Sequence, residues 1–133
     1  MIKSDVYNYI NVLDKAADAS WLRNEAISNN IANVDTPNYK RQDVTFESEL
    51  KHALGAMKFR TLDDKVEALN RTERLSQIEP RTYIDHAAFS YRLDGNNVDI
   101  DTENVELASN EIKYNALIQS IDQEFKNLKS VMK

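Results

Sequence analysis

The sequence predicts a mainly α-helical protein, built around an antiparallel coiled-coil pair of long N- and C-terminal helices. Glycine and proline, which interrupt helices, each occur only twice in 133 residues. Apolar residues near both ends of the chain recur in alternating steps of four and three, the heptad spacing of a coiled coil. Between the long helices we expect a short third helix, a loose central insert and a small β-hairpin.

The first long helix is expected to begin after a cap at Ser4 or Asp5. Its heptad stripe, the N-terminal seam, consists of Val6, Ile10, Leu13, Ala17, Ser20, Asn24, Ile27, Ile31 and Val34. The polar residues Ser20 and Asn24 interrupt this stripe. Two interpretations stay open: an amphipathic helix packed within its own domain, or a seam that pairs with another long helix. Asn33 is expected to end the helix in a left-handed conformation.

The second long helix is expected to run from an N-cap at Asp101 to the end of the chain, a stretch without glycine or proline. Its stripe, the C-terminal seam, consists of Leu107, Glu111, Tyr114, Ile118, Ile121, Phe125, Leu128 and Met132. A second row of Val105, Ala108 and Ile112 widens the apolar face. Two helices of similar length at opposite ends of a chain most simply form an antiparallel pair.

The middle of the chain has shorter and weaker apolar patterns than its two ends. Thr45 is expected to cap a short helix that ends near Gly55. Residues 58–88 are polar and weakly patterned, which favours a loose or partly disordered insert with a helical turn or two. We therefore divide the chain into 1–57, the insert 58–88, and 89–133, with the first and last parts forming one assembly domain.

A β-hairpin is expected just before the last helix. Phe89, Tyr91 and Leu93 alternate with polar residues, as in a half-buried strand. Asp94 and Gly95 form a strong turn signal, and Val98 and Ile100 alternate on the far side. The hairpin turn is thus predicted at Asp94, Gly95, Asn96 and Asn97.

The composition argues against most reactive chemistry. A net charge of −5 weighs against nucleic-acid binding, and the absence of cysteine excludes thiolate metal sites. His52 and His86 have no companion at metal-ligand spacing, and two distant glycines cannot form a phosphate loop. We therefore expect no enzyme, no cofactor, no metal and no small-molecule substrate. No apolar run is long enough to span a membrane, and the N-terminus does not resemble a Sec signal peptide.

The N-terminal helix ends in "NNIANVDTPNYK", residues 29–40. This stretch resembles the "N-I-A-N-x-x-T-P-G-Y" pattern of the bacterial flagellar axial proteins, the rod, hook and hook-filament junction family. The residues at these positions, which we call the turn motif, are Asn30, Ile31, Ala32, Asn33, Thr36, Pro37, Asn38 and Tyr39. Residues 41–50, "LDGNNVDID" at 93–101 and "KYNAL" at 113–117 are similar to rod members of that family.

The resemblance implies a structural subunit of the proximal rod in the flagellar basal body, joining the inner-membrane ring to the distal rod and transmitting torque. It implies export by the flagellar type III apparatus to a periplasmic location without a Sec signal. The implied partners are copies of itself, other rod proteins, the rod adaptor and the inner-membrane ring. The residues alone leave open a soluble helical adaptor, or a flagellar or type III secretion chaperone, that binds a partner helix.

One position departs from the family pattern, which has glycine where this chain has Asn38. A type II turn with Pro37 at its second position requires positive φ at the next residue. Asparagine tolerates that region better than other non-glycine residues. The turn is therefore expected to form, at a modest conformational cost.

Overall fold

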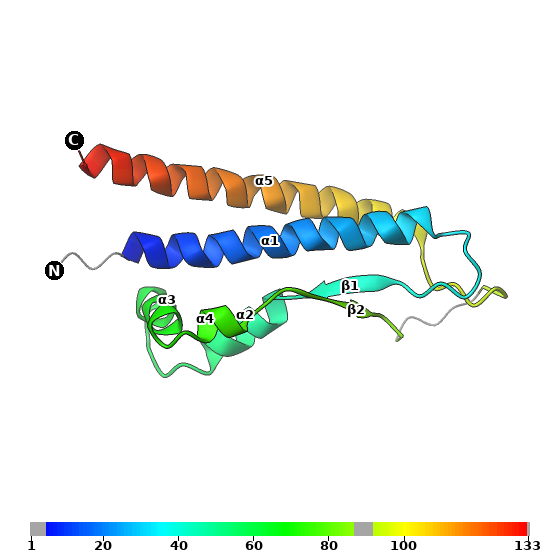
Figure 1. The fold of residues 1–133 in the computed structure, drawn as a ribbon, viewed down its shortest axis with the longest axis horizontal. Coiled ribbons are helices and arrows are strands. Elements are labelled where there is room, and N and C mark those ends of the chain that lie inside the picture. The colour runs from blue at the N-terminus through cyan, green and yellow to red at the C-terminus, as the bar shows by residue number, and fades with distance from the viewer. Residues whose placement is uncertain (1–4, 87–91, 133) are drawn as a thin grey trace.

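Two long helices run side by side in opposite directions and bring both ends of the chain to the same end of the molecule (Figure 1). The structure is a computed structural model that describes residues 5–86 and 92–132, apart from the side chains of Asp5 and Val6. Helix α1 spans Asp5–Ala32 and helix α5 spans Ile100–Val131. The predicted fold class, mainly helical with an antiparallel pair of terminal helices, is confirmed. Ser4 and the Val6 side chain lie outside the described residues.

Helix α5 begins two residues earlier than the sequence predicts. Asp99 is its N-cap, and its carboxylate accepts from the main-chain N–H of Asp101 at 3.0 Å and of Thr102 at 3.4 Å. Asp101 is not the cap, because it already lies in the first turn of the helix. There its negative charge interacts favourably with the positive end of the helix dipole.

Helix α1 packs with two different faces, of which the sequence predicts one. Toward α5, the Ser20 carbonyl oxygen accepts from the Asn110 side chain at 2.8 Å, and the Trp21 ring contacts the Tyr114 ring. The opposite face carries Val12, Ala16 and Ala19, which pack against a small lobe on the other side (Figure 1). This second stripe lies one residue before the predicted seam, so α1 is covered on two sides.

The lobe consists of α2 (Glu47–Gly55), α3 (Leu62–Arg71) and α4 (Arg74–Gln77). Its buried core with α1 is formed by Ala19, Phe46, Leu69, Leu75 and Ile78. Partly buried Leu50, Ala53, Leu54 and Met57 of the α2 segment pack against this core. The central segment therefore holds more regular structure than the sequence predicts. Its helices are short and strongly charged, and only a few apolar residues in each are buried. The apolar pattern is therefore too weak to predict these helices from the sequence.

A two-stranded antiparallel sheet is present, but at a different place from the predicted hairpin. Strand β1 (Gln42–Thr45) pairs with β2 (Arg81–Ile84). The described residues 92–99 form a turn without a strand, and Phe89 and Tyr91 lie outside the described residues. Brief alternation of apolar residues does not distinguish a strand from an extended loop. The real pairing joins segments that are far apart in sequence, which local patterns do not reveal.

The sequence predicts Thr45 as the cap of α2, but this prediction is wrong. Thr45 is the last residue of β1 and does not cap the helix. Its hydroxyl donates to the Arg81 carbonyl oxygen at 3.4 Å, across the sheet. Phe46 occupies the cap position of α2 and provides no side-chain hydrogen bond. Burial of Phe46 in the lobe core fixes the start of α2 instead.

The C-terminal seam only partly faces the protein. Leu107, Tyr114, Ile121 and Leu128 are half-buried on α5, whereas Ile118, Phe125, Met132 and Glu111 are exposed. Glu103 and Asn110 are the buried residues of this helix. Along α5, the residues that face α1 therefore alternate between positions of the predicted C-terminal seam and positions one residue before a member of that seam. In the described part of the chain, no helix is both long and apolar enough to cross a membrane.

Candidate assembly joint

The turn motif forms a tight bend after α1. Tyr39 N donates to the Thr36 carbonyl oxygen at 3.3 Å, with Pro37 and Asn38 between them. Asn38 has φ of 60°, so it takes the positive φ that the sequence predicts. Asn38 N donates to the Asp94 carbonyl oxygen at 2.8 Å, which ties the bend to the loop before α5. Within the motif, Pro37 is exposed and Tyr39 is half-buried.

Asn33 ends α1 by a different route from the one predicted. Asn38 and Glu73 are the non-glycine residues with positive φ in the described chain, so Asn33 is not left-handed. Its side-chain amide donates to the Asn29 carbonyl oxygen at 2.8 Å, satisfying one of the free carbonyls at the helix end. Its side-chain oxygen accepts from the Thr36 hydroxyl at 3.1 Å.

Asn30 is fully buried and joins three segments of the chain. Its amide nitrogen donates to the Gln42 carbonyl oxygen at 2.8 Å and to Glu103 Oε2 at 3.0 Å. Its amide oxygen accepts from Gln42 N at 2.8 Å and from the Tyr39 hydroxyl at 3.3 Å. One side chain thus links the end of α1 to β1, α5 and the turn motif. Its neighbours Ile31 and Ala32 are half-buried and exposed, respectively.

Asn96 locks the predicted hairpin turn onto the turn motif. This buried side chain donates to three carbonyl oxygens of the motif segment: Asn33 at 2.9 Å, Val34 at 3.0 Å and Thr36 at 2.8 Å. Its own side-chain oxygen accepts from Val98 N at 2.8 Å. The two motifs that the sequence singled out separately therefore form one structure, which we call the joint.

The rest of the hairpin turn also docks on the motif. Gly95 has φ of 74°, and a Cβ atom there would lie 2.8 Å from Asn38 Oδ1. The Lys40 ammonium donates to the Gly95 carbonyl oxygen. Asn97 Oδ1 accepts from Arg41 N at 2.6 Å, and its amide donates to the Asp85 carbonyl oxygen at 2.8 Å. The positive φ favours glycine at position 95, and the Asn38 side chain leaves little room there for a Cβ atom.

Arg41 contributes a partly buried positive charge to the joint. Its Nε lies 2.5 Å from Glu103 Oε1, and a terminal nitrogen lies 3.2 Å from carboxylate oxygens of both Asp43 and Asp85. Burial lowers the pKa of Arg41, but Glu103 and Asp43 outweigh it and raise the pKa above its usual value. Burial, together with the Glu103 charge, raises the pKa of Tyr39, which keeps that phenol neutral.

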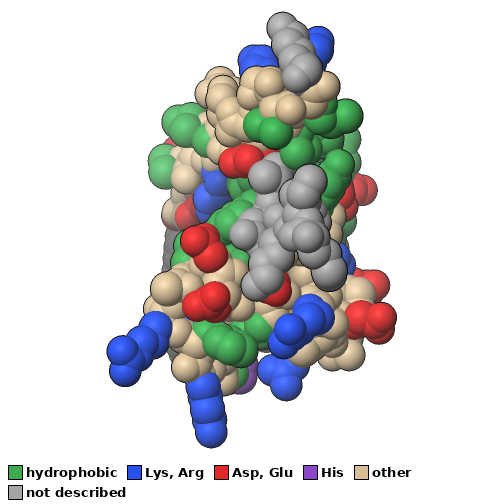
Figure 2. All heavy atoms as spheres, turned by 90° about the vertical axis from the view of Figure 1, so that its left-hand side faces the viewer, with side chains coloured by type: hydrophobic (Ala, Val, Ile, Leu, Met, Phe, Trp, Pro, Cys, Tyr) green, Lys and Arg blue, Asp and Glu red, His purple; other side chains and the backbone are tan. Residues whose placement is uncertain are grey.

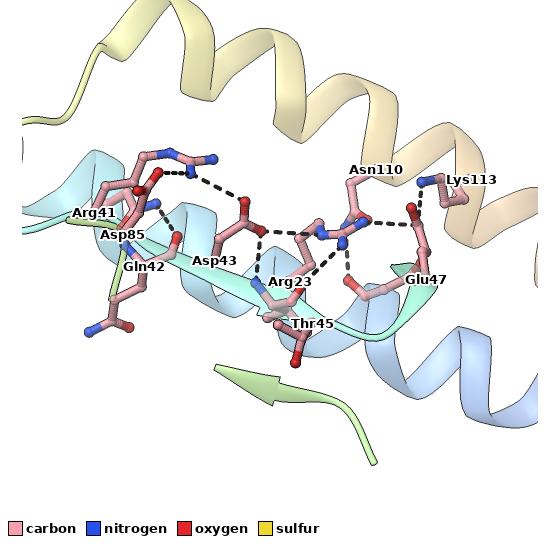
Figure 3. Close-up of polar contacts among 12 residues, drawn as sticks. Arg23, Arg41, Gln42, Asp43, Thr45, Glu47, Asp85, Asn110 and Lys113 are labelled. Carbon is pink, nitrogen blue, oxygen red and sulfur yellow. Dashed lines mark hydrogen bonds and ion pairs between the residues drawn. The ribbon is translucent and has the colours of Figure 1, made fainter. Parts of the chain in front are cut away.

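A chain of ion pairs continues from the joint along β1 to α5 (Figure 3). Arg23 on α1 lies 3.6 Å from Asp43 and 3.0 Å from Glu47, and it also donates to the Val44 carbonyl oxygen. Glu47 in turn lies 2.6 Å from the Lys113 ammonium of α5. The hydrogen bond from Lys113 lowers the pKa of Glu47. Partial burial acts in the opposite direction, and Arg23 lowers the pKa further.

Sequence patterns did not reveal Arg23, Arg41 or Glu103. Charged residues at such positions look like an ordinary solvated helix face or loop until the partner segments are known. Extended backward from Leu107, the C-terminal seam reaches Asn104, so Glu103 lies one residue before the seam and has no local signal.

The joint is suited to holding elements in place, because its buried polar groups satisfy one another. Among the described residues, no group of three potential ligands gathers to hold a metal ion. His52 and His86 are exposed, and neither takes part in the hydrogen bonds of the joint described above. A fully paired polar network rigidifies the elements that it connects.

Comparison with known proteins gives the family. A family model described as "Flagella basal body rod protein" matches residues 10–40, from within α1 through the turn motif. The FlgB protein of Bacillus subtilis is 34% identical over 120 residues, covering 90% of this chain and 89% of the relative. This chain belongs to the FlgB family of flagellar basal body rod proteins. The resemblance stated from the sequence is therefore confirmed.

Further FlgB relatives come from other bacteria. FlgB of Borreliella burgdorferi is 35% identical over 121 residues, which cover 87% of this chain and 89% of the relative. FlgB of Escherichia coli K12 is 32% identical over 120 residues, which cover 83% of this chain and 82% of the relative. The FlgB likeness thus includes both long helices, the lobe and the joint.

Proposed function

We propose that this FlgB-family chain is a structural, non-enzymatic subunit of the proximal rod of the flagellar basal body. It assembles helically, connects the inner-membrane ring to the distal rod and transmits torque. Its partners are copies of itself, other rod proteins, the rod adaptor and the inner-membrane ring. The flagellar type III apparatus exports it to the periplasm without a Sec signal.

The observation that carries this proposal is the exposure of large apolar side chains on two faces of α5. Ile118, Phe125 and Met132, spaced seven residues apart, form one face, which we call the uncovered apolar row, and Phe125 is 52% exposed. Val105 and Ile112 are exposed on a second face, where Ile112 is 72% exposed, and Val131 is exposed near the end of the helix. Monomeric proteins rarely leave so many large apolar side chains on one helix, and such rows mark protein–protein interfaces. Neighbouring subunits in a rod would cover this row, while the joint holds α5 at a fixed angle to α1.

The division of the chain into 1–57, 58–88 and 89–133 stays a prediction. Packing of α2 on α3 and α4 ties part of the first segment to the insert. We propose that α1, the joint and α5 form the part that assembles, and that the lobe braces α1 from its other face. The turn motif, the hairpin turn and the two seams are the residues assigned to assembly.

A substitution on the uncovered row tests the proposal. Ile118→Ser combined with Phe125→Ser should leave the helix content of the isolated chain unchanged and reduce its amount in purified basal bodies. Ser109→Ala, at an exposed polar position of α5, is the matched control. Normal incorporation and normal swimming of the double variant would contradict the proposed role of this row.

The alternative, a soluble adaptor or secretion chaperone, predicts that the chain stays in the cytoplasm. A rod subunit should leave the cytoplasm only when the flagellar export gate works. Fractionation of cells with and without a working gate separates the two. Because His52 and His86 have no part in the joint, His52→Ala with His86→Ala should leave motility unchanged.

A further inference from the structure

A polar notch interrupts the interface between α1 and α5, halfway along both helices. It is a cavity of about 240 Å³ lined by Ser20, Trp21, Asn24, Asn110, Glu111, Tyr114 and Asn115. Two of these residues, Ser20 and Asn24, are the polar interruptions of the N-terminal seam. A coiled-coil interface would normally place apolar side chains there, so the polar lining requires a reason.

Two side-chain amide oxygens at the bottom of the notch accept no hydrogen bond. Asn110 is 3% exposed, and its amide nitrogen is occupied by the Ser20 carbonyl oxygen at 2.8 Å. The side-chain oxygens of Asn110 and Asn24 are buried, and neither has a partner among the described residues. An unsatisfied buried acceptor costs about 1–3 kcal/mol, which a donor entering the notch would remove.

The rim of the notch favours a positively charged donor. Glu111 lines it with an exposed carboxylate that makes no ion pair within the described chain. The Trp21 and Tyr114 rings lie beside each other with centroids 6.3 Å apart, and Trp21 is 64% exposed. Amide oxygens, a carboxylate and aromatic rings together match a lysine ammonium or an arginine guanidinium.

This chain itself carries suitable cations at the surface of the lobe. Figure 2 shows Lys and Arg side chains standing out from the lower part of the end that holds both termini, where Figure 1 places α3 and α4. Lys51, Lys58 and Arg60 of the lobe are exposed and form no ion pair within the described chain.

We propose that the notch receives a lysine or arginine side chain from the lobe of a second copy of this chain. This inference rests on the proposed rod assembly and names one contact within it. The ammonium or guanidinium donates to the Asn110 and Asn24 side-chain oxygens, and Glu111 neutralises its charge. The notch therefore fixes the register of neighbouring copies, while the uncovered apolar row supplies most of the buried area.

Photo-crosslinking tests the occupant. A benzophenone amino acid placed at Asn115, on the exposed rim, is activated in whole basal bodies, and the cross-linked peptides are identified by mass spectrometry. A cross-link to the lobe of a second copy, within a few residues of a lysine or arginine, is expected. Cross-links only to another rod protein, only to segments without a basic residue, or to nothing in assembled rods would overturn the proposal.

A substitution that occupies the notch from within its own chain gives a second test. Asn115→Lys places an ammonium at the rim and should lower the amount of the chain in purified basal bodies by about tenfold, the effect of losing roughly 1.4 kcal/mol of contact. Gln119→Lys adds the same charge one turn away, at a position outside the notch, and should assemble normally. Equal incorporation of both variants would overturn the proposal.

These tests separate the notch from the wider function. Wild-type chain present in purified basal bodies supports the rod assignment, whatever occupies the notch. If the wild-type chain is absent from basal bodies, the rod assignment and the notch proposal both fail. Helix content of Asn115→Lys, measured by circular dichroism, should equal that of the wild type, so a folding defect is recognised directly.

Discussion

Asn30 and Glu103 meet inside the joint, where the Asn30 amide donates to Glu103 Oε2 at 3.0 Å and both side chains are fully buried. The other carboxylate oxygen of Glu103 binds Arg41. The end of α1 and the start of α5 are therefore connected by polar contacts, and the angle between the helices depends on them.

Replacing Asn30 with leucine should lower the free energy of unfolding by about 3 kcal/mol, because several buried partners lose their hydrogen bonds at once. Gln42 N, the Gln42 carbonyl oxygen and the Tyr39 hydroxyl would all be left without the Asn30 amide. Urea unfolding followed by circular dichroism measures the change. Asn29→Leu, at an exposed neighbouring position, should shift the midpoint far less. Equal effects of the two substitutions would contradict the role given to Asn30.

Asn96→Asp is expected to separate the two motifs of the joint. The substitution keeps the size of the side chain but turns a donor to three carbonyl oxygens into a negatively charged acceptor. We expect a loss of about 2–4 kcal/mol in stability and failure to enter the rod. Asn104→Asp adds the same charge at an exposed site on α5 and serves as the control. Normal swimming of Asn96→Asp cells in soft agar would show that the joint does not depend on this side chain.

Gly95 and Asn38 should be energetically coupled. Gly95→Ala places a Cβ in a left-handed conformation and close to Asn38 Oδ1, and should cost about 2 kcal/mol. Asn38→Gly restores the residue of the family pattern and should change stability by less than about 0.5 kcal/mol. In the Asn38→Gly background, Gly95→Ala should cost about 1 kcal/mol less, because the clash is gone while the φ strain remains. Purely additive unfolding free energies would rule out the contact.

The ion pairs around Glu47 predict a loss of stability in acid. The Lys113 hydrogen bond holds the pKa of Glu47 below its ordinary value of 4.5. A carboxylate with a lowered folded pKa stabilises the protein above its unfolded pKa, and this stabilisation disappears as the pH falls through the folded pKa. The difference in unfolding free energy between wild type and Glu47→Gln should therefore shrink from pH 6 to below about 4.5. Glu49→Gln, on the exposed side of α2, is the matched control for the removal of one negative charge.

The sequence predicts the parts of this fold that depend on local periodicity. Heptad spacing located α1 and α5, and a proline followed by asparagine located the bend with positive φ at Asn38. The hydrogen bonds from Asn96 to the carbonyls of Asn33 and Thr36 could not be predicted from the sequence. About 60 residues separate the partners, and no local pattern encodes such a contact. The same reason explains the misplaced strands. Strand β1 pairs with β2 through main-chain hydrogen bonds, which impose little requirement on side-chain type.

Helix α5 should become more stable toward its C-terminus only when the rod assembles. Its buried residues, Glu103 and Asn110, both lie in its first third, and beyond them the described helix has exposed or half-buried side chains only. Backbone hydrogen bonds with few buried contacts open at low free energy. In the isolated chain, amides of residues 118–131 should therefore exchange with solvent much faster than amides of residues 104–110.

In purified basal bodies, the amides of residues 118–131 should become protected, because neighbouring subunits cover Ile118 and Phe125. Amides of residues 20–30 in α1, which packs against other elements on two faces, provide an internal control and should be protected in both samples. Hydrogen–deuterium exchange with mass spectrometry resolves these segments. Uniformly slow exchange along α5 in the isolated chain would mean that the helix is stable by itself, and that assembly is not needed to order its exposed half.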